Sequence, residues 1–214
     1  MREIKTFVRA LVWLSSTSGA LFGAPAYELG LGIETNAPAL AAEVRHEEGP
    51  GLLPADRAYV MAGTNKFAFL VPAGLKLETW NEHLVALVTR DYSSQITMRL
   101  AGPLPPEGSD LNPDDYSARL LEEHPGAKII KTFSAFADSR RGPAYEVEFP
   151  GPAGSSRRAE IAFIPSRSAV LEFSLICNPE KFEAARQQLS TVMLTFRGSD
   201  ASGQLHISPL SDKL

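Results

Sequence analysis

Cysteine is nearly absent from this chain of 214 residues, which has a single one, Cys177. One cysteine cannot close an internal disulfide, and its position far from the N-terminus excludes the acylated cysteine of a lipoprotein. Cys177 ends an apolar run that begins at Ala169, with no basic residue or histidine close to it in sequence. We therefore expect a small buried side chain and not a reactive thiol.

An excess of positive charge is also missing. The net charge is −4, with 21% charged and 44% hydrophobic residues, which is typical of a soluble globular protein. Because binding to a phosphate backbone needs a basic face, nucleic acid is not the expected partner. The 16 glycines and 16 prolines indicate many turns but are too few for a disordered chain.

Residues 1–26 are predicted to be a signal peptide. Three basic residues lie in the first nine positions, an apolar stretch follows, and Ala24-Pro25-Ala26 offers the small side chains that signal peptidase reads. Polar residues at 15–19 interrupt the apolar stretch, which leaves it shorter than the roughly 20 residues of a membrane span. We expect cleavage after Ala26 or, alternatively, after Ala20, and a periplasmic or secreted mature chain with a net charge of −6.

Three further segments are predicted. Residues 27–57 contain many glycines and prolines and no sustained periodicity, which indicates a linker or mobile N-terminal segment that docks on the domain or stays mobile. A short helix within it, from Pro38 to Glu48, is suggested by Leu40 and Val44 at a spacing of four. Residues 58–198 form the folded domain, and the polar residues 199–214 form a disordered tail.

The domain is predicted to be α+β. Short apolar runs separated by turn residues indicate antiparallel strands, because the connections have hairpin length. Asn112-Pro113 and Asn178-Pro179 are typical helix starts, and the second helix has an apolar stripe for packing on a sheet. We therefore expect one antiparallel sheet covered by helices. The expected strands are 59–61, 66–71, 75–80, 84–90, 95–100, 128–137, 144–149, 158–164 and 169–176. In residues 144–149, Tyr145, Val147 and Phe149 alternate with Glu146 and Glu148, so the two sets are expected to point to opposite faces of the sheet.

Two stretches resemble a known family. The run from Phe67 to Gly74 resembles the F-x-F-x-x-P-x-G opening of PsbP-like domains, which are named for an extrinsic subunit of photosystem II. The helix after Asn178-Pro179 and the closing Thr195-Phe196 are similar to the end of these domains. The resemblance covers about residues 58–198 and implies an α-β-α sandwich with a non-catalytic binding role, as in DcrB-like periplasmic proteins. The chain lacks the subunit's lysine-rich amino-terminal region, so no photosynthetic role is implied.

Residues for catalysis or cofactor binding do not form a pattern in this sequence. The four histidines, His46, His83, His124 and His206, lack the spacing of a metal site. Gly-x-Ser-x-Gly and the glycine motifs of nucleotide-binding loops do not occur. We therefore predict a non-enzymatic protein without catalytic residues, metal or cofactor.

Arginines supply the candidate binding residues. Arg140-Arg141 and Arg157-Arg158 flank a strand of about six residues, which spans roughly 20 Å, so the two pairs lie at opposite ends of the sheet. Arg167 comes one strand later and returns to the first end. Arg140, Arg141 and Arg167 are therefore predicted to form one rim that binds a small anion or an acidic partner, although loop arginines also serve solubility alone.

The predicted function is an exported, non-enzymatic binding or scaffold module that docks onto a protein partner or a membrane complex. One alternative is a carrier of a small ligand, with a lipid or pigment held between the sheet and the C-terminal helix. The other is a hydrolase or metal-dependent enzyme whose site is assembled from distant residues, for example with His83 or His124 beside two carboxylates.

Overall fold

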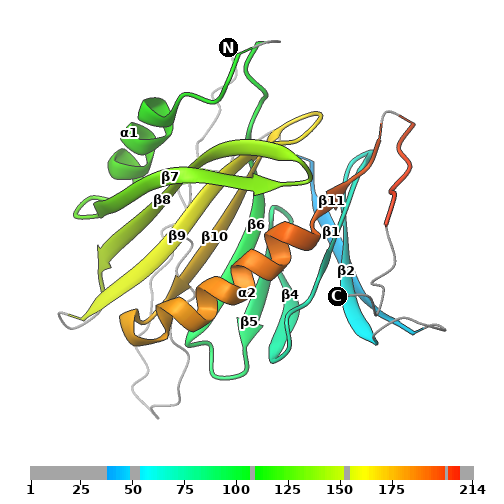
Figure 1. The fold of residues 1–214 in the computed structure, drawn as a ribbon, viewed down its shortest axis with the longest axis horizontal. Coiled ribbons are helices and arrows are strands. Elements are labelled where there is room, and N and C mark those ends of the chain that lie inside the picture. The colour runs from blue at the N-terminus through cyan, green and yellow to red at the C-terminus, as the bar shows by residue number, and fades with distance from the viewer. Residues whose placement is uncertain (1–37, 49–53, 107–108, 152–154, 201, 208–214) are drawn as a thin grey trace, which may run out of the picture.

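Antiparallel β-structure dominates the fold (Figure 1). The computed structural model describes residues 38–48, 54–106, 109–151, 155–200 and 202–207. These residues form two α-helices and two sheets, of seven and four strands. The α+β class agrees with the prediction, whereas the single sheet that was expected is in fact two.

The larger sheet has the strand order β4-β5-β6-β10-β9-β8-β7, and all neighbours are antiparallel. It consists of two meanders, one from β4 to β6 and one from β7 to β10, which meet where β6 pairs with β10. The strands are β4 (Leu75–Asn81), β5 (Leu84–Thr89), β6 (Ser94–Gly102), β7 (Lys128–Ala137), β8 (Arg140–Pro150), β9 (Ser156–Pro165) and β10 (Val170–Cys177).

The smaller sheet corrects the prediction for residues 27–57. Its strands are β1 (Leu40–Glu47), β2 (Ala55–Ala62), β3 (Asn65–Leu70) and β11 (Arg197–Gly198), in the order β1-β2-β3-β11. The helix expected from Pro38 to Glu48 is wrong, because β1 pairs along its whole length with β2. Pairing overrides the weak strand preference of its alanines and glutamates. Of the two outcomes left open for this segment, the described part docks on the domain.

Helix α1 (Pro113–Glu123) lies on one face of the larger sheet. It begins as predicted, with Pro113 in the first position and the Asn112 side-chain oxygen accepting the Asp114 N–H at 3.2 Å. Leu120 is buried in a cluster with the β8 row that the alternating pattern indicates. That row consists of Tyr145, Val147 and Phe149.

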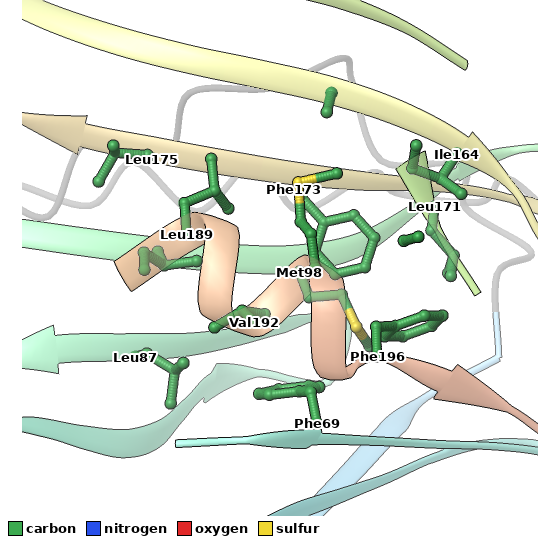
Figure 2. Close-up of a cluster of buried hydrophobic side chains, with 14 of the residues drawn as sticks. Phe69, Leu87, Met98, Ile164, Leu171, Phe173, Leu175, Leu189, Val192 and Phe196 are labelled. Carbon is green, nitrogen blue, oxygen red and sulfur yellow. The ribbon is translucent and has the colours of Figure 1, made fainter. Parts of the chain in front are cut away.

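Helix α2 (Phe182–Thr195) packs on the opposite face and follows a short 3₁₀ turn, η2 (Pro179–Lys181). In Figure 2, Leu189 and Val192 point into a cluster with Phe173 of β10 and Phe69 of β3. The smaller sheet thus covers part of the face that helices alone were expected to cover. The predicted stripe is buried throughout: Phe182, Ala185, Leu189 and Val192.

The beginning of the predicted tail is ordered by contacts with the domain. The Ser199 N–H donates to the Lys66 carbonyl at 2.8 Å, and the Asp200 carboxylate accepts the Ser202 N–H at 2.8 Å and the Gln204 N–H at 2.9 Å. The prediction of disorder is therefore wrong for residues 199, 200 and 202–207. Residues 1–26, predicted to be a signal peptide, and residues 208–214 lie outside the described residues. No helix in the described part is long and apolar enough to cross a membrane.

Candidate functional site at the arginine rim

The three candidate arginines lie at one end of the larger sheet, where the antiparallel topology placed them. Arg140 and Arg141 begin β8, and Arg167 lies in the turn between β9 and β10. The pairing of β8 with β9 brings Arg140 beside Ser166, and the Arg140 guanidinium donates to the Ser166 carbonyl. We call Arg140, Arg141 and Arg167 the arginine rim.

Only two members of the rim share a cavity. Arg140 and Arg167 line a small cavity of about 30 Å³. Arg141 is absent from this lining, because side chains alternate along a strand, and its Nε donates to Ser134 Oγ at 3.0 Å. The sequence interpretation treated the three arginines as one group, although the period of two already separates Arg140 from Arg141.

Other walls of the cavity come from distant parts of the chain. Phe67 and Phe196 form apolar walls, and polar groups surround them. No sequence signal connected β3 and the C-terminal segment with the rim, because these contacts depend on the packing of the second sheet. The polar lining residues besides the arginines are Asn65, Asp138, Ser166 and Ser199.

The rim arginines have no carboxylate within ion-pair distance among the described residues. Arginine ion pairs in this part of the chain involve Arg45, Arg57, Arg99, Arg158 and Arg186 instead. Asp138 lines the cavity, but its Oδ2 accepts the Gly198 N–H at 3.1 Å. With two guanidinium groups and one carboxylate, the lining carries a net positive charge suited to an anion.

A tight hairpin positions the rim. Asp138 and Ser139 form the turn between β7 and β8 with positive φ values of 50° and 60°. This conformation costs a residue with a side chain about 1–2 kcal/mol, and aspartate tolerates it better than most. Behind the turn, a Cβ on Gly142 would stand 1.7 Å from the Phe163 carbonyl oxygen, so glycine allows β8 to approach β9 closely.

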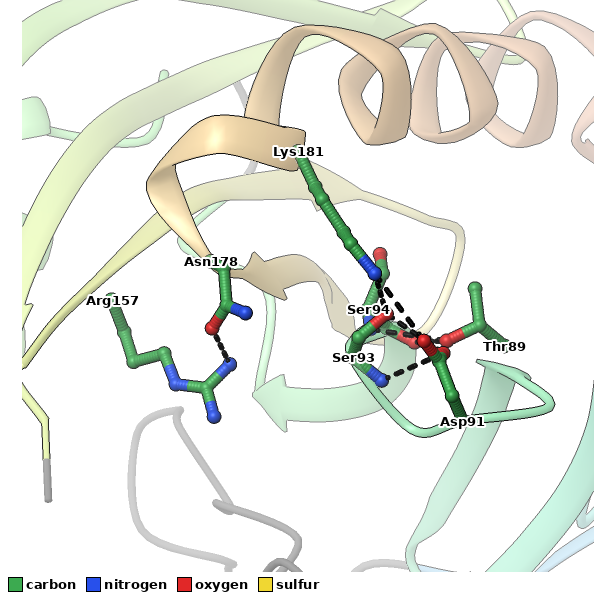
Figure 3. Close-up of polar contacts among 7 residues, drawn as sticks. All are labelled: Thr89, Asp91, Ser93, Ser94, Arg157, Asn178 and Lys181. Carbon is green, nitrogen blue, oxygen red and sulfur yellow. Dashed lines mark hydrogen bonds and ion pairs between the residues drawn. The ribbon is translucent and has the colours of Figure 1, made fainter.

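At the opposite end of β8 and β9, cations are engaged within the molecule (Figure 3). Arg157 donates to Asn178 Oδ1, and Lys181 Nζ lies 2.7 Å from Ser93 Oγ and 3.3 Å from Asp91 Oδ2. Hydrogen bonds from Ser93 and Thr89, with a further contact from Lys181, hold the pKa of Asp91 well below its usual range. This end, which we call the engaged end, offers few free cations to a partner.

Arg158 also belongs to the engaged end. It donates to the carboxylate of Glu146, and its guanidinium lies 4.7 Å from the centre of the Phe182 ring. Glu146 points away from the Tyr145 row, as predicted, but α2 covers this face and buries it. Beside it, Glu160 Oε2 lies 2.8 Å from Arg186 Nε, and burial raises the pKa of Glu160 despite this ion pair.

The residues considered for catalysis are not gathered into a site. His124 lies edge-on to Phe149 with ring centres 5.4 Å apart, and His83 Nε2 is 3.4 Å from one carboxylate, that of Glu82. Among the described residues, no group of three or more histidine, cysteine, aspartate or glutamate side chains is arranged to hold a metal ion. Cys177 is buried as expected, and burial raises the pKa of its thiol to about 11.

No protein-family model matches the chain, and no curated protein matches it. Among solved structures, the chain is similar to LpqN of Mycobacterium tuberculosis, which is described as involved in cell envelope biogenesis. The sequence identity is 14% and the TM-score is 0.46. The match covers 75% of the present chain and 92% of LpqN. The cyanobacterial PsbP of Synechocystis matches with 12% sequence identity and a TM-score of 0.40. This match covers 78% of the present chain and 97% of the PsbP chain. A Pseudomonas aeruginosa protein of unknown function, PA94, matches with 18% sequence identity and a TM-score of 0.34. This match covers 56% of the present chain and 96% of PA94. A PsbP structure is thus among the chains that resemble this one, and the likeness concerns the fold alone.

Proposed function

We propose that this chain is an exported, non-enzymatic binding module that docks an acidic surface of a protein partner on its arginine rim. The observation that carries the proposal is the contrast in charge pairing: Arg140 and Arg167 line a cavity without an ion-pair partner among the described residues, whereas the cations of the engaged end are bound internally. The cavity of about 30 Å³ is large enough for one carboxylate-sized group.

Export and membrane association belong to the same proposal. Residues 1–26 would direct the chain to the periplasm or the exterior, and a membrane complex in the envelope would be one kind of partner. The three-layer α-β-α arrangement implied by the PsbP-like resemblance is part of this proposal too. Mass spectrometry of the exported protein tests the leader: the mature chain should begin at residue 21 or 27, and a retained Met1 in an envelope fraction contradicts export.

Chemical cross-linking in the envelope fraction tests docking. At low salt, the parent chain should capture a partner that the triple variant Arg140→Ala/Arg141→Ala/Arg167→Ala captures less well. This advantage of the parent should shrink as salt rises, because exposed charge contacts are screened. A control variant, Arg90→Ala/Arg119→Ala/Lys128→Ala, removes the same charge from three exposed positions outside the rim. Equal capture by both variants, or recovery of the protein alone, would count against the proposal.

The described residues leave no space for a ligand at the position predicted for the carrier function, between the sheet and the C-terminal helix. The space between the larger sheet and α2 is filled by buried side chains from α2, β10, β6 and the smaller sheet (Figure 2). A ligand would therefore need a different location, away from this core.

A further inference from the structure

A surface hollow of about 490 Å³ lies over β1 and β2, on the side of the smaller sheet that faces away from the core. Its size falls within the roughly 300–1,000 Å³ of small-molecule sites. The cross-strand row Ala41, Met61 and Lys66 crosses the hollow, and Tyr59 stands beside this row. The short side chain of Ala41 leaves room between these larger neighbours.

The wall at Tyr59 is held in place before any ligand arrives. The Tyr59 hydroxyl donates to Glu47 Oε1 at 2.6 Å, and the Arg45 guanidinium lies 4.6 Å from the centre of the tyrosine ring. Arg57 Nε donates to the same Glu47 carboxylate and lies 3.0 Å from each of its two oxygens. A fixed wall lowers the entropy cost of binding.

An aliphatic side chain from the C-terminal segment forms part of the wall of the hollow. Leu205, from the ordered C-terminal segment, lines it together with Met61 and Ala41. Two contacts hold this segment in place near the turn at Asp200. Before the turn, the Ser199 N–H donates to the Lys66 carbonyl. After the turn, His206 Nε2 lies 2.8 Å from the Asp200 carboxylate. The apolar part of the wall therefore extends from β1 and β2 to the C-terminal segment.

The charge at the edge of the hollow determines which head group a ligand can have. Arg45 is bound to Glu43, which leaves the exposed Lys66 as a cation that makes no ion pair with the described residues. Met61, with 51% of its surface exposed, lies directly across the strand pair from Lys66. An apolar surface thus ends at an available ammonium group.

We infer that this hollow binds a free aliphatic carboxylate of the fatty-acid class. Its hydrocarbon chain would lie along Met61, Tyr59 and Leu205, and its carboxylate would pair with Lys66. The inference does not depend on docking at the arginine rim, because Arg140 and Arg167 take no part in it.

Isothermal titration of the full chain with decanoate below its micelle concentration tests the inference, with decyltrimethylammonium as the probe of opposite charge. Decanoate should bind the parent and lose about tenfold in affinity with Met61→Glu, which places a carboxylate in the apolar part. Lys66→Gln should lower decanoate affinity about threefold and should not lower decyltrimethylammonium affinity. Leu205→Ala should lower decanoate affinity, since it removes apolar surface from the wall of the hollow.

Leu194→Glu is the matched control, because Leu194 is 73% exposed on α2 and does not line the hollow. An equal loss with this variant, or equal affinity for the two probes, overturns the inference. Binding to phosphatidylglycerol vesicles without binding to free decanoate would also overturn it, in favour of a lipid surface. Circular dichroism of each variant checks that the fold is retained, which we expect because Met61 and Lys66 are exposed.

Discussion

The two ends of strands β8 and β9 both carry arginines, yet the fold uses them differently. At the engaged end, Arg158 holds the buried Glu146 and Arg157 holds Asn178. At the rim, Arg140 has only the Ser166 carbonyl, and Arg167 makes no ion pair among the described residues. Arginines of the same charge therefore meet internal side-chain acceptors at one end and make no ion pair with the described residues at the other.

Gly142→Ala should cause the largest change, because it breaks the support of the rim. The added Cβ would stand 1.7 Å from the Phe163 carbonyl oxygen and force β8 away from β9. We expect a loss of about 3 kcal/mol or more in the free energy of unfolding. Urea unfolding measures it, and amide exchange should show faster opening at Arg140 than in the turn at Asp91. A variant as stable as the parent would contradict the close approach.

The same substitution at the two ends provides a direct contrast. Arg158→Ala leaves Glu146 buried without its partner and should cost about 1–3 kcal/mol of unfolding free energy, a range that allows for the partial exposure of Arg158. Arg167→Ala should change it by less than about 0.5 kcal/mol. Thermal unfolding of the two variants side by side checks this. Equal losses would mean that the rim is also structural.

The Glu160 carboxyl makes the engaged end sensitive to pH. Burial raises its pKa in the folded protein above the ordinary 4.5, so the folded state binds more protons than the unfolded state. The contribution of this group to stability should therefore increase as pH falls through the raised pKa toward 4.5. Denaturant titrations at several pH values should show this slope in the parent and a flatter one in Glu160→Gln. Parallel pH profiles would refute the assignment.

Asp91→Asn should have a small effect on stability, less than about 1 kcal/mol, because its contact with Lys181 is exposed. It should nevertheless release the Lys181 ammonium group at the engaged end. In the parent, the low pKa of Asp91 keeps this contact intact until the pH falls well below 3.8. Binding of an acidic peptide near Lys181, followed by NMR, should appear in the variant and be absent from the parent at neutral pH.

Local signals in the sequence predicted much of this fold. Asn112-Pro113 marked a helix start because its cap is formed within the next two residues. The alternation of Tyr145, Val147 and Phe149 identified the face under α1 because a strand has a period of two. Both signals depend on near neighbours in the chain.

The remaining features depend on distant contacts. β1 is a strand because β2 pairs with it, although Ala41, Ala42 and Glu43 favour no strand on their own. Asn178 caps no helix through its side chain and accepts a hydrogen bond from Arg157 instead. The topology placed Arg140 and Arg167 at one end, but Phe196 and Ser199 reach the cavity only through the second sheet.

NMR of the arginine Nε–Hε groups tests the contrast between the two ends most directly. The full chain is titrated with an acetylated oligoglutamate peptide at low salt, where exposed charges are least screened. We expect the signals of Arg140 and Arg167 to shift together to saturation and to return as salt is added, while those of Arg157 and Arg158 stay in place. Shifts of equal size at both ends, or an unmoved Arg140 and Arg167, would contradict the account.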